Sequence, residues 1–125
     1  MNELPPQIQN QLGQIQQVQQ QAQALMQQKA QVEMLLRETE RAHEELMKTE
    51  EGAEVYKAAG ELLIKAKRED VIKDLEDKKD NLDVRLKSLA RQEERLQARF
   101  NQLQEQLKQQ LGKIQGGGPK GGVAE

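Results

Sequence analysis

The sequence predicts a mainly α-helical protein: a long antiparallel coiled-coil hairpin of two helices, with one β-hairpin between them that joins a larger β-sheet or β-barrel shared among several chains. Three observations support this prediction. Apolar residues recur every seven positions in two long segments, as in coiled-coil helices. Between these segments, residues 53–66 are typical of two short strands around a glycine. All 21 glutamines lie in 7–31 or 92–115, and an antiparallel fold brings these two segments together.

The composition excludes a broad globular core. Of the 125 residues, 35% are hydrophobic and 2% aromatic, whereas 32% are charged. Aromatic and large aliphatic side chains supply most of the volume of such a core. Long helices and full disorder are the alternatives, and the seven-residue period favours helices.

Charge and cysteine content exclude further classes. The chain has 19 basic and 21 acidic residues, a net charge of −2, whereas a nucleic-acid partner requires a basic face. Without cysteine there is no disulfide and no thiolate metal site. Residues 1–6 do not form a signal peptide, and no apolar stretch approaches the ~20 residues that span a membrane. We therefore expect a cytoplasmic protein with no membrane partner.

A lead-in of residues 1–5 precedes the first predicted helix, 6–51. Pro5 and Pro6 mark its start, because proline fits the first turn of a helix. Gly52 marks its end. The a and d positions of its heptads form a seam that faces the other helix. They are Ile8, Gln11, Ile15, Val18, Ala22, Leu25, Lys29, Val32, Leu36, Thr39, His43 and Leu46.

The second predicted helix covers 68–114 and has the stricter repeat. Glu69 and Asp70 place negative charge in its first turn, where the helix dipole favours it. Its seam positions are Ile72, Leu75, Lys79, Leu82, Leu86, Leu89, Glu93, Leu96, Phe100, Leu103, Leu107, Gln110 and Ile114. Residues 115–125 are predicted to be a flexible, glycine-rich tail.

Two charged seam residues suggest how the helices align. Antiparallel pairing places Lys29 and Glu93 in adjacent layers of the seam. An opposite-charge pair inside a coiled coil can specify its register. We therefore predict that Lys29 and Glu93 set the register of the coil.

Residues 52–67 form the predicted β-hairpin. Val55, Tyr56 and Ile64 suit strands, and Gly60 lies in the turn between the two runs. A short third helix is the competing interpretation, since Ala58 and Leu62 are helix formers. A lone two-stranded hairpin is marginal in water, and its open edges invite pairing with other chains. The predicted oligomerisation residues are Val55, Tyr56, Gly60, Leu62, Leu63 and Ile64.

The sequence contains no catalytic or metal-binding constellation. His43 is the single histidine, whereas a metal site needs several ligands, so a polar seam residue beside Lys79 is the better interpretation. The glycine-rich residues 116–122 lack the spacing of a phosphate-binding loop. We therefore predict a protein that is not an enzyme and uses no cofactor or metal.

The open end of the coil, where both termini lie, has extra apolar residues. Leu12 and Leu111 lie beside the seam, on flanks that face each other in an antiparallel pair. One interpretation is a coil end that these contacts hold shut. The other is a partly exposed patch that binds another molecule. The predicted binding residues are Leu4, Ile8, Leu12, Ile15, Leu107, Leu111 and Ile114.

Taken together, these segments resemble the beta class of archaeal prefoldin subunits. The resemblance covers residues 4 to 111 and rests on the order and spacing of several pieces. They are Leu4–Leu12, Val55–Gly60, Leu63–Lys65, Asp70, Leu75–Lys79 and Leu86–Leu96. The sequence departs from the family at Ala66–Glu69, where a Ser or Thr often caps the second helix.

The resemblance implies a chaperone subunit in a hexamer of two alpha-class and four beta-class chains, assembled through the hairpins. It also implies that the coil ends hold non-native proteins without ATP and deliver them to a group II chaperonin. The alternative function is a structural coiled-coil adaptor that binds one specific folded partner.

Overall fold

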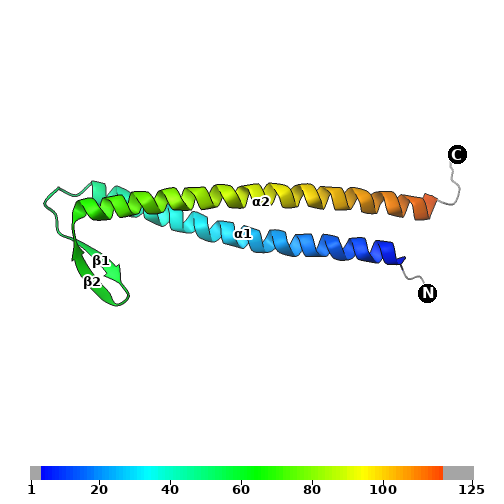
Figure 1. Ribbon diagram of the computed structural model, residues 1–125, viewed down its shortest axis with the longest axis horizontal. Coiled ribbons are helices and arrows are strands. Elements are labelled where there is room, and N and C mark those ends of the chain that lie inside the picture. Colours follow the sequence, from blue (N-terminus) through cyan, green and yellow to red (C-terminus); the bar gives the residue numbers. More distant parts are fainter. Residues whose placement is uncertain (1–3, 117–125) are drawn as a thin grey trace. The chain divides into compact units, whose positions relative to one another are not determined.

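The computed structural model describes residues 4–116, and the side chains of residues 4–114. Its elements, in chain order, are α1 (Pro6–Met47), β1 (Val55–Ala59), β2 (Leu62–Ala66) and α2 (Arg68–Gly116) (Figure 1). Two long helices with one β-hairpin between them are the predicted architecture, which is thereby confirmed. The first two residues of the predicted tail, 115 and 116, instead continue α2. The rest of that tail and the first three residues of the lead-in lie outside the described residues.

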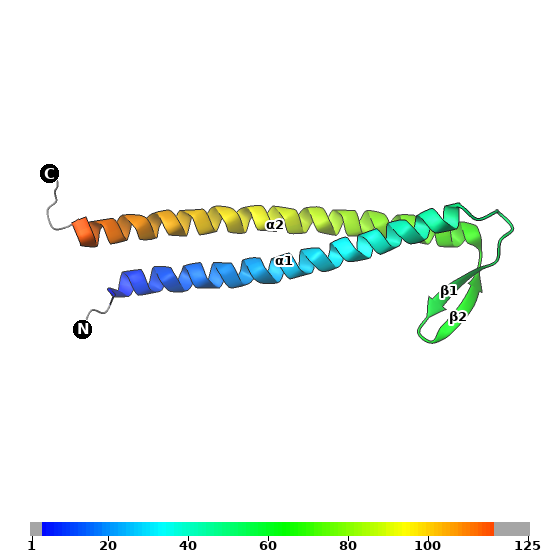
Figure 2. The ribbon, with the colours of Figure 1, turned by 180° about the vertical axis from the view of Figure 1, so that it is seen from behind.

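The chain divides into two compact units. Unit 1 combines the chain up to Gln27 with the chain from Arg91 onward, and unit 2 is Gln28–Ala90. In unit 1, the beginning of α1 lies beside the end of α2, and the two run in opposite directions (Figures 1 and 2). In unit 2, the rest of each helix forms a second antiparallel pair, which continues into the hairpin.

Burial follows the predicted seam. Every predicted a and d position of α1 is buried or half-buried. Among the predicted a and d positions of α2, only Lys79 and Ile114 are exposed. The buried apolar residues are Ile8, Val18, Leu25, Val32, Leu82, Leu89 and Leu103. A narrow apolar stripe with a seven-residue period is the pattern of a coiled coil, in which each helix covers one face of the other.

The helix α1 ends at Met47, four residues before the predicted boundary at 51. The backbone N–H of Thr49 bonds to the carbonyl of Leu46 at 3.1 Å, a tight turn that closes the helix. The hydroxyl of Thr49 donates to the same carbonyl at 2.6 Å. Thr49 thus satisfies a carbonyl that the helix leaves free, and the chain turns before it reaches Gly52.

The strands β1 and β2 form an antiparallel pair, with Val55 opposite Ala66 and Ala59 opposite Leu62. Gly60 has a φ of 62°, the left-handed region that glycine adopts without steric cost, and it opens the two-residue turn. The predicted hairpin is therefore confirmed, and the competing short helix is not formed. Strands are favoured here because Val55, Tyr56 and Ile64 are β-branched or aromatic.

Candidate functional site

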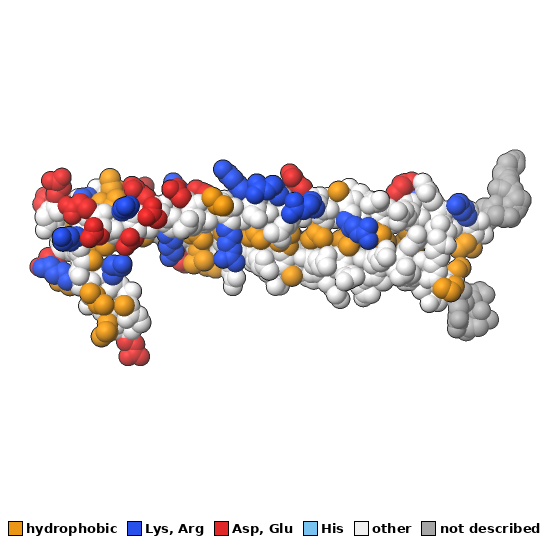
Figure 3. All heavy atoms as spheres, in the orientation of Figure 1, with side chains coloured by type: hydrophobic (Ala, Val, Ile, Leu, Met, Phe, Trp, Pro, Cys, Tyr) orange, Lys and Arg blue, Asp and Glu red, His pale blue; other side chains and the backbone are white. Residues whose placement is uncertain are grey.

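The hairpin exposes large apolar side chains. Leu62, Leu63 and Ile64 are 66%, 73% and 51% exposed, and Tyr56 is 51% exposed. The hydrophobic residues of the hairpin stand out from the charged surface of unit 2 in Figure 3. We call the six predicted oligomerisation residues the assembly surface. All of them are exposed except Val55, which is half-buried.

Both faces of the hairpin carry large apolar side chains. Side chains alternate between the faces of a strand, and directly opposed residues share a face. The register therefore places Val55, Leu62 and Ile64 on one face, and Tyr56 and Leu63 on the other. The described sheet has two strands, so each strand also has an unpaired outer edge. A hairpin with two apolar faces and two open edges suits burial inside a larger sheet.

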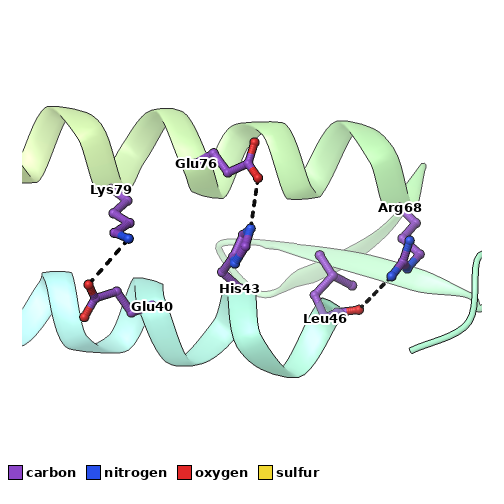
Figure 4. Close-up of polar contacts among 6 residues, drawn as sticks. All are labelled: Glu40, His43, Leu46, Arg68, Glu76 and Lys79. Carbon is purple, nitrogen blue, oxygen red and sulfur yellow. Dashed lines mark hydrogen bonds and ion pairs between the residues drawn. The ribbon is translucent and has the colours of Figure 1, made fainter. Parts of the chain in front are cut away.

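Two contacts join the hairpin and its stem to the helices. The Lys57 ammonium group pairs with the Asp74 carboxylate at 3.1 Å, linking β1 to α2. The Arg68 guanidinium donates to the carbonyls of Leu46 and Thr49 at 3.2 and 3.0 Å, and to the Thr49 hydroxyl at 2.9 Å. Arg68 thus caps the last turn of α1 from the first turn of α2 (Figure 4).

Sequence reasoning missed both contacts. Each joins residues about twenty positions apart, and no local pattern encodes such a pairing. The available signal for Arg68 was general: the last carbonyls of α1 need donors, and basic residues follow the hairpin.

Two further ion pairs join the helices of unit 2. His43 Nε2 lies 3.1 Å from Glu76 Oε2, and Lys79 Nζ lies 3.8 Å from Glu40 Oε2 (Figure 4). The polar partner of His43 is thus Glu76, whereas the sequence suggested a position beside Lys79. Both contacts join a seam position of one helix to a flank position of the other. Within residues 4–114, no three His, Asp or Glu are grouped so that they could hold a metal ion.

We call the seven predicted binding residues the tip; all of them belong to unit 1. Three of them are exposed: Leu4 by 44%, Leu12 by 41% and Ile114 by 50%. Ile8 is only 1% exposed, and Ile15, Leu107 and Leu111 are half-buried. The tip is therefore a buried seam with an apolar rim.

The exposure of Leu111 and Ile114 differs from that expected from the heptads. Ile114 has a seam position but is exposed, whereas Leu111 lies beside the seam and is half-buried. In both ribbon views, α2 extends past the start of α1. The last turn of α2 therefore lacks a facing helix, which leaves Ile114 open to solvent.

Gln11 is the polar exception inside the tip. It occupies a seam position and is 9% exposed. Among the described residues, no partner bonds to its side-chain oxygen, Oε1, which is buried. A buried acceptor without a partner costs about 1–3 kcal/mol. Sequence reasoning placed Gln11 in the seam but did not assign it a role.

The predicted register pair, Lys29 and Glu93, is half-buried at both positions. Lys29 belongs to unit 2 and Glu93 to unit 1. Their pairing stays a prediction. Over the described residues, neither helix contains an apolar run sufficient to cross a bilayer.

Comparisons with known proteins place this arrangement in a family. Residues 9–114 match the family model described as prefoldin subunit. The chain is 87% identical to the prefoldin subunit beta of Methanocella arvoryzae, over the full length of both. It is 52% identical to that of Methanothrix thermoacetophila, covering 96% of this chain and 98% of the relative. It also resembles the crystal structure of the prefoldin beta subunit from Thermococcus strain KS-1, with a TM-score of 0.82 and 37% identity. The match covers 89% of this chain and 97% of that structure's chain.

Proposed function

The chain belongs to the prefoldin subunit family. We propose that it is an ATP-independent chaperone subunit that holds non-native proteins, its clients, at the tip. Prefoldin is a family of chaperone subunits and not of enzymes, and the likeness throughout is to its beta members. The observation that carries the proposal is the apolar rim of the tip, formed by Leu4, Leu12 and Ile114.

The rim suits a client without fixed structure. A non-native chain exposes apolar segments of many shapes, so its binder needs apolar contacts that tolerate variation. The exposed residues of α1 one helical turn before and after Leu12 are glutamines, Gln9 and Gln16. These amides form hydrogen bonds without the desolvation cost of a charge. A surface of this kind binds many clients weakly, and several tips acting together raise the overall affinity.

Assembly places several tips in one particle. The family forms hetero-oligomeric complexes, and we propose a hexamer of two alpha-class and four beta-class chains. The exposed apolar side chains of the assembly surface support this role, since pairing with other hairpins would bury them. The same complex would pass its clients to a group II chaperonin in the cytoplasm, without a cofactor.

The proposal is tested by measuring whether the complex prevents the aggregation of several unrelated denatured proteins. The assembled complex, without nucleotide, is mixed with reduced insulin, with heat-denatured citrate synthase and with a further unrelated denatured protein. The reductant that cleaves the insulin disulfides does not alter this chain, because it contains no cysteine and therefore no disulfide. We expect light scattering to fall for all three clients. An adaptor with one folded partner would leave all three to aggregate, and that result would contradict the proposal.

Native mass spectrometry tests the assembly. This chain mixed with an alpha-class subunit should give one species with the mass of two alpha-class and four beta-class chains. A stable monomer in the mixture would contradict assembly through the hairpin.

A further inference from the structure

The buried amide of Gln11 has no structural explanation within the described residues. Buried polar groups in folded proteins are almost always hydrogen-bonded. Here the side-chain oxygen of Gln11 is buried and has no partner among residues 4–114, although a leucine would fill the same seam position without this defect. An acceptor held in this state is ready for a donor that arrives from outside.

Two glycines weaken the helices around it. Gly13 in α1 and Gly112 in α2 both lie in unit 1, close to the rim residues Leu12 and Ile114. A Cβ atom at either glycine would meet none of the described atoms within 4 Å, so packing in the described part of the chain does not require glycine there. Glycine inside a helix is destabilising relative to alanine. The helix ends at the tip therefore open at lower cost than the rest of the coil.

A non-native polypeptide supplies the missing donor. Its exposed segments carry apolar side chains and backbone N–H groups that have lost their native partners. When the helix ends separate, Ile8 becomes available for apolar contact, beside Gln11 in the same stretch of α1. A backbone N–H is common to every non-proline residue, so this hydrogen bond would not depend on the sequence of the client.

We propose that the client inserts an extended apolar segment between the helix ends of the tip, where Gln11 Oε1 accepts a hydrogen bond from a backbone N–H of that segment. This inference rests on the proposed function and specifies its ligand. Gln11 thereby contributes a polar contact to a surface that is otherwise apolar. This contact favours an extended segment with an accessible backbone N–H over a ligand that offers only apolar side chains.

The test compares two probe peptides on the assembled complex. One is a fluorescein-labelled, lysine-flanked leucine–alanine peptide, and the other is the same peptide with its central backbone nitrogens methylated. Fluorescence anisotropy gives the ratio of their dissociation constants. For the parent we expect the unmethylated peptide to bind about three- to ten-fold tighter, the range of one neutral hydrogen bond. In Gln11→Leu the ratio should fall close to one.

The matched control is Gln19→Leu, which replaces an exposed glutamine of α1 in the same unit. It should keep the ratio of the parent. Methylation also changes the conformation of the peptide, but it does so equally for every variant. An unchanged ratio in Gln11→Leu, or an equal fall in Gln19→Leu, would overturn the role of Gln11.

A second variant tests the opening of the tip. Gly13→Ala combined with Gly112→Ala should weaken both peptides by about five-fold or more, because alanine stabilises the closed helices. The control Asn81→Ala stabilises α2 at an exposed position of unit 2 and should leave both affinities unchanged. Unweakened binding by the double alanine variant would contradict the opening.

The outcomes separate this inference from the proposed function. A parent complex that suppresses aggregation, but whose peptide ratio does not depend on Gln11, would overturn the inference alone. A parent complex that binds neither peptide and lets reduced insulin aggregate would overturn both.

Discussion

Arg68 connects the end of one helix with the start of the next. Its guanidinium donates to two carbonyls and one hydroxyl of the α1 terminus, while its own backbone begins α2. The rigid fork of arginine suits several acceptors at once, which the single ammonium group of lysine cannot match. Arg68 therefore holds the two helices together at the base of the hairpin.

Replacing Arg68 should destabilise unit 2. We expect Arg68→Ala to lower the free energy of unfolding by about 1 kcal/mol, because the Thr49 carbonyl loses this donor and the Leu46 carbonyl keeps only its bonds from Thr49. Arg68→Lys should recover only part of this loss. Urea titration at fixed protein concentration, followed by circular dichroism, provides the measurement. The control Lys67→Ala removes an exposed neighbouring charge and should have little effect. Equal stability of Arg68→Ala and the parent would contradict the role of Arg68 in capping α1.

We predict that Lys29 and Glu93, which are both half-buried, set the register of the coil. Replacing either residue by leucine combines lost pairing with gained apolar packing, so a single variant gives an ambiguous result. A double-mutant cycle isolates the coupling between them. We expect a coupling above about 0.5 kcal/mol, measured by urea unfolding. A smaller value would show that the two residues do not meet and that the register is set elsewhere.

The hairpin exposes apolar side chains and is also tied to a helix. Its strands present apolar faces, and the Lys57–Asp74 ion pair ties it to α2. Both side chains of that pair are about half exposed, so its contribution to stability is small. We interpret the pair as a guide for the direction of the hairpin.

A charge on either face of the hairpin should prevent assembly. Ile64→Asp and Leu63→Asp place a carboxylate on opposite faces, where we propose that neighbouring strands pack. We expect the mass of the complex to fall to that of smaller species, while the helical circular dichroism signal persists. Val84→Asp is the control, since Val84 is 65% exposed on α2 and lies outside the hairpin. A full-size complex in both hairpin variants would refute the hairpin as the site of assembly.

The elements could be predicted from the sequence because each rests on a local pattern. The seven-residue period gave the seam, down to buried polar residues such as Gln11 and Thr39. Strand-forming residues around Gly60 gave the hairpin. The partners of Arg68 and His43 could not be predicted, because they depend on how distant side chains meet. The exposure of Ile114 depends on where the facing helix α1 begins, and the heptad pattern of α2 alone does not show this.

At the scale of the whole molecule, the two units carry different chemistry. Unit 1 is rich in glutamine and ends in an apolar rim, whereas unit 2 carries dense charge and the hairpin (Figure 3). This division matches the two proposed tasks, since client holding needs an uncharged, tolerant surface and assembly needs a specific one. Each tip offers few apolar side chains, so we expect useful affinity for a client to require several tips in one complex.

The most direct test compares two pairs of exposed apolar residues. Leu12→Gln with Ile114→Gln removes two residues of the rim; Leu111 is left intact because it is half-buried. Met34→Gln with Val84→Gln, in unit 2, removes two side chains of similar exposure. Both variants should assemble to the mass of the parent complex and melt close to its temperature.

The measurement is the concentration of complex that halves the aggregation of reduced insulin. We expect the Leu12 and Ile114 variant to need at least about three-fold more protein, because it loses apolar burial at every beta-class tip. The Met34 and Val84 variant should match the parent. If the tip variant holds the client as well as the parent, or if both variants weaken equally, the tip is not the site of client binding.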